Sequence, residues 1–407
     1  MLSFEQARHV VEQHASCLRP QGKERVGLVA SVGRVLAEPL VADRNFPPFP
    51  RATRDGYALR AADLSSLPAM LTVVGEIKAG AEATIQVGLG QAAAIMTGAA
   101  APAGADSVVM VEYTSRKGDK VEVSRGIAVG ENIVLSGAEA KLGDRLLSPG
   151  VRLDAAAIAL ASSVGKPDLL VYARPRVAVL ATGDELVDVD VLPAPHEIRN
   201  SNSYSLAAQI LAAGGQPVVL PIAPDEPQRL RELIVDGLKA DLLLLSGGVS
   251  AGRYDLVEQV LGELKAEFFF TGAQIQPGRP LVFGRLPGTR DRASDCRYFF
   301  GLPGNPVSTM VTFELFAKPV VEALAGVTPT QLVFLRARLK SEVKTKAGLR
   351  RFLPAVLSGE FAQAEVELVP WHGSGDMAAT ARANCYLVIA PSEERIEAGE
   401  WVPVLLR

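Results

Sequence analysis

Several polar or glycine-rich loops between residues 182 and 306 follow apolar runs and lead into expected helices. Their residues are Thr182-Gly183-Asp184-Glu185, Pro224-Asp225-Glu226, the 246–252 segment SGGVSAG and the 301–306 segment GLPGNP. Glycine lets a backbone approach a ligand closely, and the start of a helix offers free N–H groups to an anion. Carboxylates in or beside these loops, among them Asp225 and Asp255, would repel that anion unless a hard cation such as Mg²⁺ bridged them to a phosphate. The residue types therefore favour a phosphate site that uses Mg²⁺.

Each of these features also has a purely structural explanation. Asp255 opens the sequence Asp-Leu-Val-Glu, which is a capping-box pattern, and Asp225 could cap the next helix in the same way. The glycines could simply form tight turns. For Asp225 and Asp255 taken singly, the structural explanation is favoured. For all the loops taken together on one edge of a sheet, the functional explanation is favoured.

Most other catalytic motifs are missing from the sequence. The chain has no GxxxxGK[ST], GxGxxG or HExxH pattern, and its histidines (His9, His14, His196, His372) lack metal-ligand spacing. The segment Gly248–Gly252 does match the GxSxG pattern of α/β-hydrolases, with Ser250, Asp295 and His372 in the order of a triad. This hydrolase hypothesis is disfavoured because His372 lies beyond the α/β section and because it leaves Asp225 and Asp255 without a role.

The elements that position these loops alternate between strands and helices over residues 176–326. Apolar runs such as RVAVLATG, QPVVLPIA and DLLLLSGG predict strands, as do the segments FFFTGAQI and RYFFGLPG. Between them lie helical patterns, and one long helix is predicted over 305–326. Continuous apolar strands are typical of a sheet covered on both faces, and the alternation predicts a doubly wound, mostly parallel α/β domain. In such sheets ligands bind outside the carboxyl ends of the strands, where these loops lie.

The rest of the chain follows other patterns. Residues 4–16 and 151–164 are helical in pattern, the proline-rich 46–50 is an extended crossing, and short Val/Ile runs over 70–146 predict a small β module. Residues 330–407 return to short strands that predict a β-barrel or sandwich. The predicted organisation is multidomain α/β plus β: a helical region (1–50 with 141–173), a β module (51–140), an α/β domain (174–326) and a C-terminal barrel-like β domain (327–407).

Composition limits the classes of function. The chain has 407 residues, a net charge of -3, 48% hydrophobic residues and 6% aromatic residues, so neither nucleic acid nor a membrane surface is an expected partner. The cysteines Cys17, Cys296 and Cys385 are odd in number and widely spaced, which suits a reducing compartment. The N-terminus has charges inside its apolar pattern and no signal-peptide core. We therefore expect a cytoplasmic protein without a membrane span.

The ordered set of motifs resembles one family, the molybdopterin molybdenumtransferases (the MoeA and gephyrin E-domain family). Ser246–Asp255 resembles that family's SGGVSxGxxD element, Gly301–Ser308 its GLPGNPxS element, and Thr182–Leu186 with Asn200–Ser203 its TGDEL and sNS pair. The N-terminal half and the end of the chain add further matches: Asp55–Ala58, Thr97-Gly98, Gly104–Asp106, Glu112, Gly373–Asp376 and Ala383-Asn384. The matches keep their order over positions 55–384, so the resemblance is specific.

The resemblance implies a fold, a reaction and a set of site residues. It implies that 1–50 with 141–173 forms a dimerisation region, that 174–326 is a molybdopterin-binding domain, and that the site lies between this domain and the β module of the other subunit of a homodimer. The implied reaction takes adenylylated molybdopterin and molybdate, requires Mg²⁺, and releases molybdenum cofactor and AMP. Molybdopterin adenylyltransferase and molybdoenzyme-maturation proteins are the implied partners.

By the same resemblance, four carboxylates are expected to be catalytic: Asp55, Glu185, Asp225 and Asp255. Two of these, Asp225 and Asp255, are also expected to hold Mg²⁺. The expected substrate-binding residues are Thr97, Thr182, Gly247, Gly248, Ser250, Gly252, Arg279, Pro303, Gly304, Asn305 and Ser374. Electrostatic positioning of two anions, rather than a covalent nucleophile, is the expected mechanism.

The chain departs from the family at four basic positions, which are occupied here by Val134, Gly272, Gln276 and Pro354. Candidates to replace the lost charge are Arg54, Arg253, Arg350 and Arg351. The alternative is a diverged member, either a non-catalytic pterin-binding scaffold or an enzyme with altered specificity such as tungstate use. Adenylylation of molybdopterin is a further alternative, against which the additional N- and C-terminal modules argue.

Overall fold

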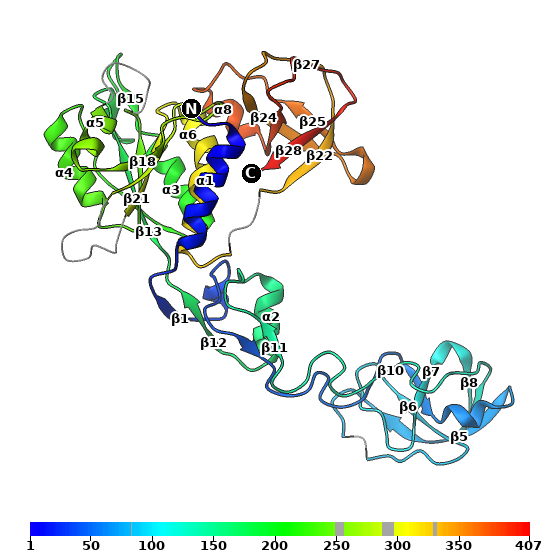
Figure 1. Cartoon of the computed structure of the whole chain (residues 1–407). Coiled ribbons are helices and arrows are strands. Elements are labelled where there is room, and N and C mark those ends of the chain that lie inside the picture. The colour runs from blue at the N-terminus through cyan, green and yellow to red at the C-terminus, as the bar shows by residue number, and fades with distance from the viewer. Residues whose placement is uncertain (83, 249–255, 287–296, 329–331) are drawn as a thin grey trace.

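The computed structural model describes residues 1–82, 84–248, 256–286, 297–328 and 332–407. Figure 1 shows an α/β domain beside a C-terminal β domain, and a separate β module at the far end of a slender connecting region. No helix among the described residues is both long enough and apolar enough to span a membrane.

The α/β domain is built on a six-stranded sheet. Across the sheet the strands are β16 (Gln216–Val219), β13 (Arg176–Ala181), β17 (Leu242–Ser246), β21 (Arg297–Leu302), β20 (Val282–Leu286) and β18 (Glu267–Phe270). The pairings from β16 to β21 are parallel, whereas β20 and β18 pair antiparallel. The helices that follow or flank the strands are α3 (Asn202–Ala213), α4 (Pro227–Gly237), α5 (Leu256–Glu263), α6 (Pro306–Thr312) and α7 (Lys318–Leu324).

Side chains of β13 show why the sheet is covered on both faces. Val177 and Val179 belong to a core with α3, α6 and α7, whereas Ala178 and Leu180 belong to a second core with α4 and α5. Successive residues of a strand point to opposite faces, so a strand between two helical layers must be apolar throughout. The predicted doubly wound, mostly parallel domain is confirmed.

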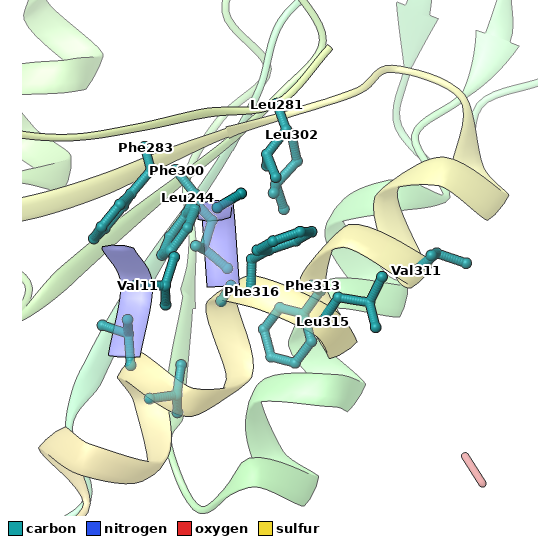
Figure 2. Close-up of a cluster of buried hydrophobic side chains, with 14 of the residues drawn as sticks. Val11, Leu244, Leu281, Phe283, Phe300, Leu302, Val311, Phe313, Leu315 and Phe316 are labelled. Atoms are coloured by element: carbon teal, nitrogen blue, oxygen red, sulfur yellow. The ribbon is translucent and has the colours of Figure 1, made fainter. Parts of the chain in front are cut away.

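The N-terminal helix α1 (Phe4–Cys17) packs onto this domain. Its buried residues Phe4, Ala7 and Val11 join the first core, and Figure 2 shows Val11 beside the aromatic side chains of that core. The predicted long helix over 305–326 is interrupted: a π-helical turn, Phe313–Ala317, separates α6 from α7. Pro319 follows directly in the first turn of α7, and a proline inside a helix removes one backbone hydrogen bond. Buried Arg8 of α1 donates to the carbonyl of Leu315 within the turn.

The connecting region is small. In each of its strand pairs, a segment that precedes the β module in sequence pairs with one that follows it. Its elements are β1 (Lys23–Gly27) with β12 (Asp168–Tyr172), β2 (Leu40–Val41) with β11 (Arg145–Leu147), and α2 (Ala155–Ser163). Leu36, Leu153 and Val171 are central to its core.

The β module has a six-stranded sheet with apolar clusters on both faces. Its strand order is β7 (Ser107–Met110), β4 (Gly56–Leu59), β6 (Gln91–Ile95), β5 (Ala69–Ile77), β9 (Lys120–Val123) and β8 (Thr114–Lys117). A second pairing, β3 (Arg51–Ala52) with β10 (Ile133–Val134), joins the entry and exit segments of the module.

The C-terminal domain is a closed five-stranded barrel, which confirms the predicted barrel-like fold. Its strands are β24 (Arg350–Ser358), β25 (Glu365–Leu368), β22 (Phe334–Leu339), β28 (Trp401–Leu406) and β26 (Cys385–Ile389), and β26 closes the barrel onto β24. The short β19 (Ile275–Gln276) of the α/β domain pairs with β24 and so links the two domains. Two further short strands, β23 (Val343–Lys344) and β27 (Arg395–Ile396), pair with each other, and α8 (Met377–Arg382) precedes β26.

Candidate functional site

A cavity of about 1220 Å³ lies where β13, β17 and β21 end. This edge is the one at which open α/β sheets bind ligands. The sequence-predicted residues that line the cavity are Thr182, Glu185, Asp225, Gly247, Gly248, Pro303, Gly304 and Asn305. Loops that follow three separate strands thus meet around one space.

Asp225 is held at the edge of this cavity by polar contacts with the β13 loop. Thr182 Oγ1 donates to Asp225 Oδ1 at 3.2 Å, and the Asp225 backbone nitrogen donates to Asp184 Oδ1 at 3.0 Å. The N-cap of α4 is Glu226, and its side chain makes no capping hydrogen bond. The capping explanation for Asp225 is therefore wrong, and its exposed carboxylate faces the cavity.

Glycine is required where the loops approach one another. Gly247 has φ +95°, and a Cβ there would lie 2.5 Å from the Thr182 carbonyl oxygen. A Cβ on Gly248 would lie 2.6 Å from a methyl carbon of Val257. A Cβ on Gly304 would lie 3.6 Å from the Cα of Gly247, so the two glycine loops run side by side. The backbone is thereby exposed to the cavity in the way that an anion-binding loop requires.

The described residues of the cavity are more acidic than basic. Glu185, Glu197 and Asp225 line it, whereas Arg199 lines it with Nε donating to the Val191 carbonyl at 3.0 Å. The Asp184 and Asp225 carboxylates offer the hard oxygen donors that Mg²⁺ prefers. Within the described part of the chain, no group of three or more His, Cys, Asp or Glu residues is placed to hold a metal ion. Asp255, the second predicted Mg²⁺ ligand, lies outside the described residues.

The C-terminal domain supplies one wall of the cavity. Gly375 and Met377 line it, and the carbonyl of the neighbouring Ser374 accepts a hydrogen bond from the Val307 nitrogen at 3.0 Å, at the start of α6. Asp376 caps α8 by accepting from the Ala379 nitrogen at 3.0 Å. Hydrogen bonds from the backbone of Ala379 and then His372 lower the pKa of Asp376. Predicted Ser374 therefore lies next to the cavity.

Arg279 lies beside the cavity without lining it. Its side chain is exposed, and its Nε lies 3.3 Å from the sulfur of Met1. The next residue, Pro280, does line the cavity. The structure thus places this predicted basic residue at the rim.

Asp55 and Thr97 form a separate polar pair in the β module. Oδ1 of Asp55 accepts from the Thr97 nitrogen at 2.6 Å and from the Thr97 hydroxyl at 2.8 Å. These bonds, the backbone one first, lower the pKa of Asp55. Both residues are exposed and neither lines the cavity. Figure 1 shows their module at the opposite end of the molecule from the α/β domain. Within one chain the predicted site is therefore in two parts.

Several predicted residues fall outside the described part of the chain. These are Ser250, Gly252 and Asp255, together with Arg253 and Asp295. His372, the third member of the hydrolase hypothesis, is exposed and pairs through Nδ1 with Asp376 at 3.3 Å.

Asn202 was absent from the predicted site although it lines the cavity. Its Nδ2 donates to Ser246 Oγ at 2.8 Å and to the Gly304 carbonyl at 2.7 Å. The only sequence signal for a role of Asn202 in the site was its place in the Asn200–Ser203 motif. Hydrophobic periodicity does not reveal which loops a side-chain amide will contact. Gly375, Met377 and Pro280 were missed for a similar reason, since their place in the wall depends on how domains and loops pack.

Fold and cavity together define a doubly wound ligand-binding domain flanked by an N-terminal β module and a C-terminal barrel. Three families match successive parts of the chain: "MoeA N-terminal region (domain I and II)" over residues 2–165, "Probable molybdopterin binding domain" over 178–323, and "MoeA C-terminal region (domain IV)" over 336–406. The chain belongs to the MoeA family of molybdopterin molybdenumtransferases.

Individual relatives are similar over nearly the whole chain. A molybdopterin molybdenumtransferase of Nostoc sp. is 35% identical over 396 residues, which cover 95% of this chain and 89% of the relative. The Bacillus subtilis molybdopterin molybdenumtransferase is 33% identical over 94% of this chain and 89% of its own length. A crystal structure of the molybdopterin biosynthesis moeA protein from Pyrococcus horikoshii superposes with a TM-score of 0.81 at 28% identity, covering 100% of both chains.

Proposed function

We propose that this protein inserts molybdenum from molybdate into adenylylated molybdopterin, with release of AMP. The observation that carries the proposal is the cavity in which the glycine loops of β17 and β21 meet the Asp225 carboxylate. Backbone N–H groups in glycine loops suit phosphate, and the cavity volume suits a nucleotide-sized ligand. Relatives of 31–35% identity carry the name molybdopterin molybdenumtransferase, which supports the same activity.

In this proposal the residues act by positioning charge. Gly247, Gly248 and Gly304 cradle the phosphate end. Asp225 together with Asp255 would hold Mg²⁺, which would supply positive charge to neutralise the phosphate. Thr182 orients Asp225 through its hydroxyl at 3.2 Å. Glu185 and Asn305 line the same space, so they contact the ligand rather than the fold alone. Two anions brought together in fixed geometry react without a covalent intermediate on the protein.

The proposal requires a homodimer. Asp55 and Thr97 belong to the predicted site, yet neither lines the cavity of its own chain. The β module of a second copy would bring this pair to the cavity and complete the site. Exposed apolar side chains of the connecting region, namely Val29, Val32 and Leu142, support an interface there.

The placement of the arginines decides which of them is the best candidate to replace the lost basic residues at the oxyanion. Arg350 pairs with Glu5 at 2.6 Å and Arg351 is buried, and neither lines the cavity. Burial lowers the pKa of Arg351. Arg54 is exposed and adjacent to Asp55, so we propose that it supplies cationic charge at the shared site.

The test is cofactor formation by the purified protein, given adenylylated molybdopterin, Mg²⁺ and molybdate, with AMP release followed in parallel. The proposal predicts that AMP appears only when the oxyanion is present and that active cofactor forms. Binding of the pterin without AMP release would instead identify a diverged member, and tungstate in place of molybdate would test altered specificity. A matched reaction with Asp225→Ala controls for spontaneous hydrolysis.

A further inference from the structure

We propose that Asn202 is a positioning residue that sets the spacing of the two glycine loops in the cavity. This inference rests on the proposed function, because it concerns how the same cavity holds the phosphate end of a nucleotide. Asn202 is the first residue of α3 and lines the cavity. It is not among the residues predicted from the family motifs to bind substrate.

One amide group ties three elements together. Asn202 Nδ2 donates to Ser246 Oγ at the end of β17 and to the Gly304 carbonyl in the loop after β21. The strands β17 and β21 are parallel neighbours, with Ser246 in register with Leu302. The bonds therefore fix the start of α3 against both loops at once. Gly247 follows Ser246 directly, so the anchored points adjoin the glycines of the cradle.

The start of α3 is itself held rigid. Asn200 Nδ2 donates to Ser203 Oγ at 3.0 Å, and the Ser203 nitrogen donates back to Asn200 Oδ1 at 3.2 Å. Both residues are buried. These two hydrogen bonds join the residues on either side of Asn202 and restrict the backbone of Asn202. The side-chain amide of Asn202 therefore holds the two loops in fixed positions.

The amide is not fully satisfied by folding. Asn202 Oδ1 is buried and has no hydrogen-bond partner among the described residues. An unpaired buried acceptor is unfavourable, so the two hydrogen bonds donated by Nδ2 must offset this cost. The two hydrogen bonds from Nδ2 to cavity loops are the benefit that the structure does show.

Gln209 provides a matched control on the same helix. Its Nε2 donates to the Met310 carbonyl of α6 at 3.1 Å, and its Oε1 is likewise buried without a partner in the described structure. Gln209 does not line the cavity. Loss of either amide therefore removes helix contacts of a similar kind, but only Asn202 adjoins the ligand loops.

The experiment measures AMP binding with Mg²⁺ by calorimetry, the KM for adenylylated molybdopterin, and thermal unfolding without ligand. We expect Asn202→Ala to weaken AMP binding and raise KM roughly tenfold or more, since small misplacements of positioning groups have large effects. Gln209→Ala should stay within about twofold of wild type in binding, as expected for a distant site. The unfolding midpoint of Asn202→Ala should be no lower than that of Gln209→Ala.

Further variants keep the inference testable if Asn202→Ala folds poorly. Asn202→Leu keeps a similar size, removes both donors and adds no charge, so it should weaken AMP binding similarly. Ser246→Ala should weaken it non-additively with Asn202→Ala. Equal AMP binding by wild type and the Asn202 variants would overturn the inference alone. A wild-type protein that binds no AMP would overturn the proposed function together with the inference.

Discussion

Thr97 donates two hydrogen bonds to the same carboxylate oxygen of Asp55, from its nitrogen at 2.6 Å and from its hydroxyl at 2.8 Å. These bonds favour the ionised form and lower the pKa of Asp55. Thr97→Val keeps the backbone bond and the side-chain shape but removes the hydroxyl. We expect the pKa of Asp55 to rise part of the way toward its ordinary value, as followed by carboxyl ¹³C NMR titration.

The same substitution should move the acid limb of the pH–activity profile to higher pH. Activity that needs the ionised Asp55 carboxylate is lost as the pH falls through the pKa of Asp55, so a raised pKa moves this loss to higher pH. Thr114→Val is the control, because the Thr114 hydroxyl donates at 2.8 Å to the Val111 carbonyl and has no contact with Asp55. An Asp55 titration that is the same in wild type and Thr97→Val would contradict the prediction.

A site shared between subunits predicts a specific pattern in mixed dimers. Asp55→Ala and Asp225→Ala should each be inactive as homodimers. A mixed dimer of the two, purified through two different tags, contains one intact site and should regain about half of wild-type activity. In the reciprocal control, wild type is paired with the Asp55→Ala/Asp225→Ala double variant, and this dimer should be inactive. The opposite pattern, in which only the control is active, would place both residues in one chain's site.

Much of the fold could be predicted because apolar patterning is local. The β13 and β17 strands are continuous apolar runs between glycine-bearing loops, and their parallel pairing follows from the intervening helices. Two features of the fold could not be predicted from the sequence. The strand β20 contains Gly284 and follows Pro280, so its sequence lacks an uninterrupted apolar run. The π-helical turn at Phe313–Ala317 receives a hydrogen bond from Arg8, a contact with a distant helix that no local pattern predicts.

The site could be predicted only in part, for a physical reason. Strand-end loops gather because parallel strands end on one edge, so Thr182, Gly247 and Gly304 could be grouped from sequence. Contacts between domains have no such periodic signal. Asn202 bridging two loops and Gly375 entering the wall from the barrel depend on how separate elements pack.

Gly247 should not tolerate a side chain. Its φ of +95° is unfavourable for L-residues, and a Cβ would lie 2.5 Å from the Thr182 carbonyl oxygen. We expect Gly247→Ala to lower the free energy of unfolding by more than about 1 kcal/mol and to abolish AMP binding. Gly375→Ala is the control, because Gly375 also lines the cavity but a Cβ there would meet no atom within 4 Å beyond its chain neighbours. Urea unfolding and calorimetry measure both effects, and equal stability of the two variants would contradict the prediction.

Asp376 should make the stability of the barrel edge depend on pH. Its carboxylate accepts from the Ala379 nitrogen at 3.0 Å and the His372 nitrogen at 3.1 Å, and these bonds lower its pKa. The stabilisation is therefore complete above the unfolded-state pKa and disappears as the pH falls through the folded-state pKa. Asp376→Ser keeps a helix-capping oxygen but cannot titrate. Urea unfolding at a series of pH values should show that wild type is more stable than Asp376→Ser at neutral pH and that this difference in stability shrinks in acid. A difference in stability that is constant with pH would mean that the charge of Asp376 does not stabilise α8.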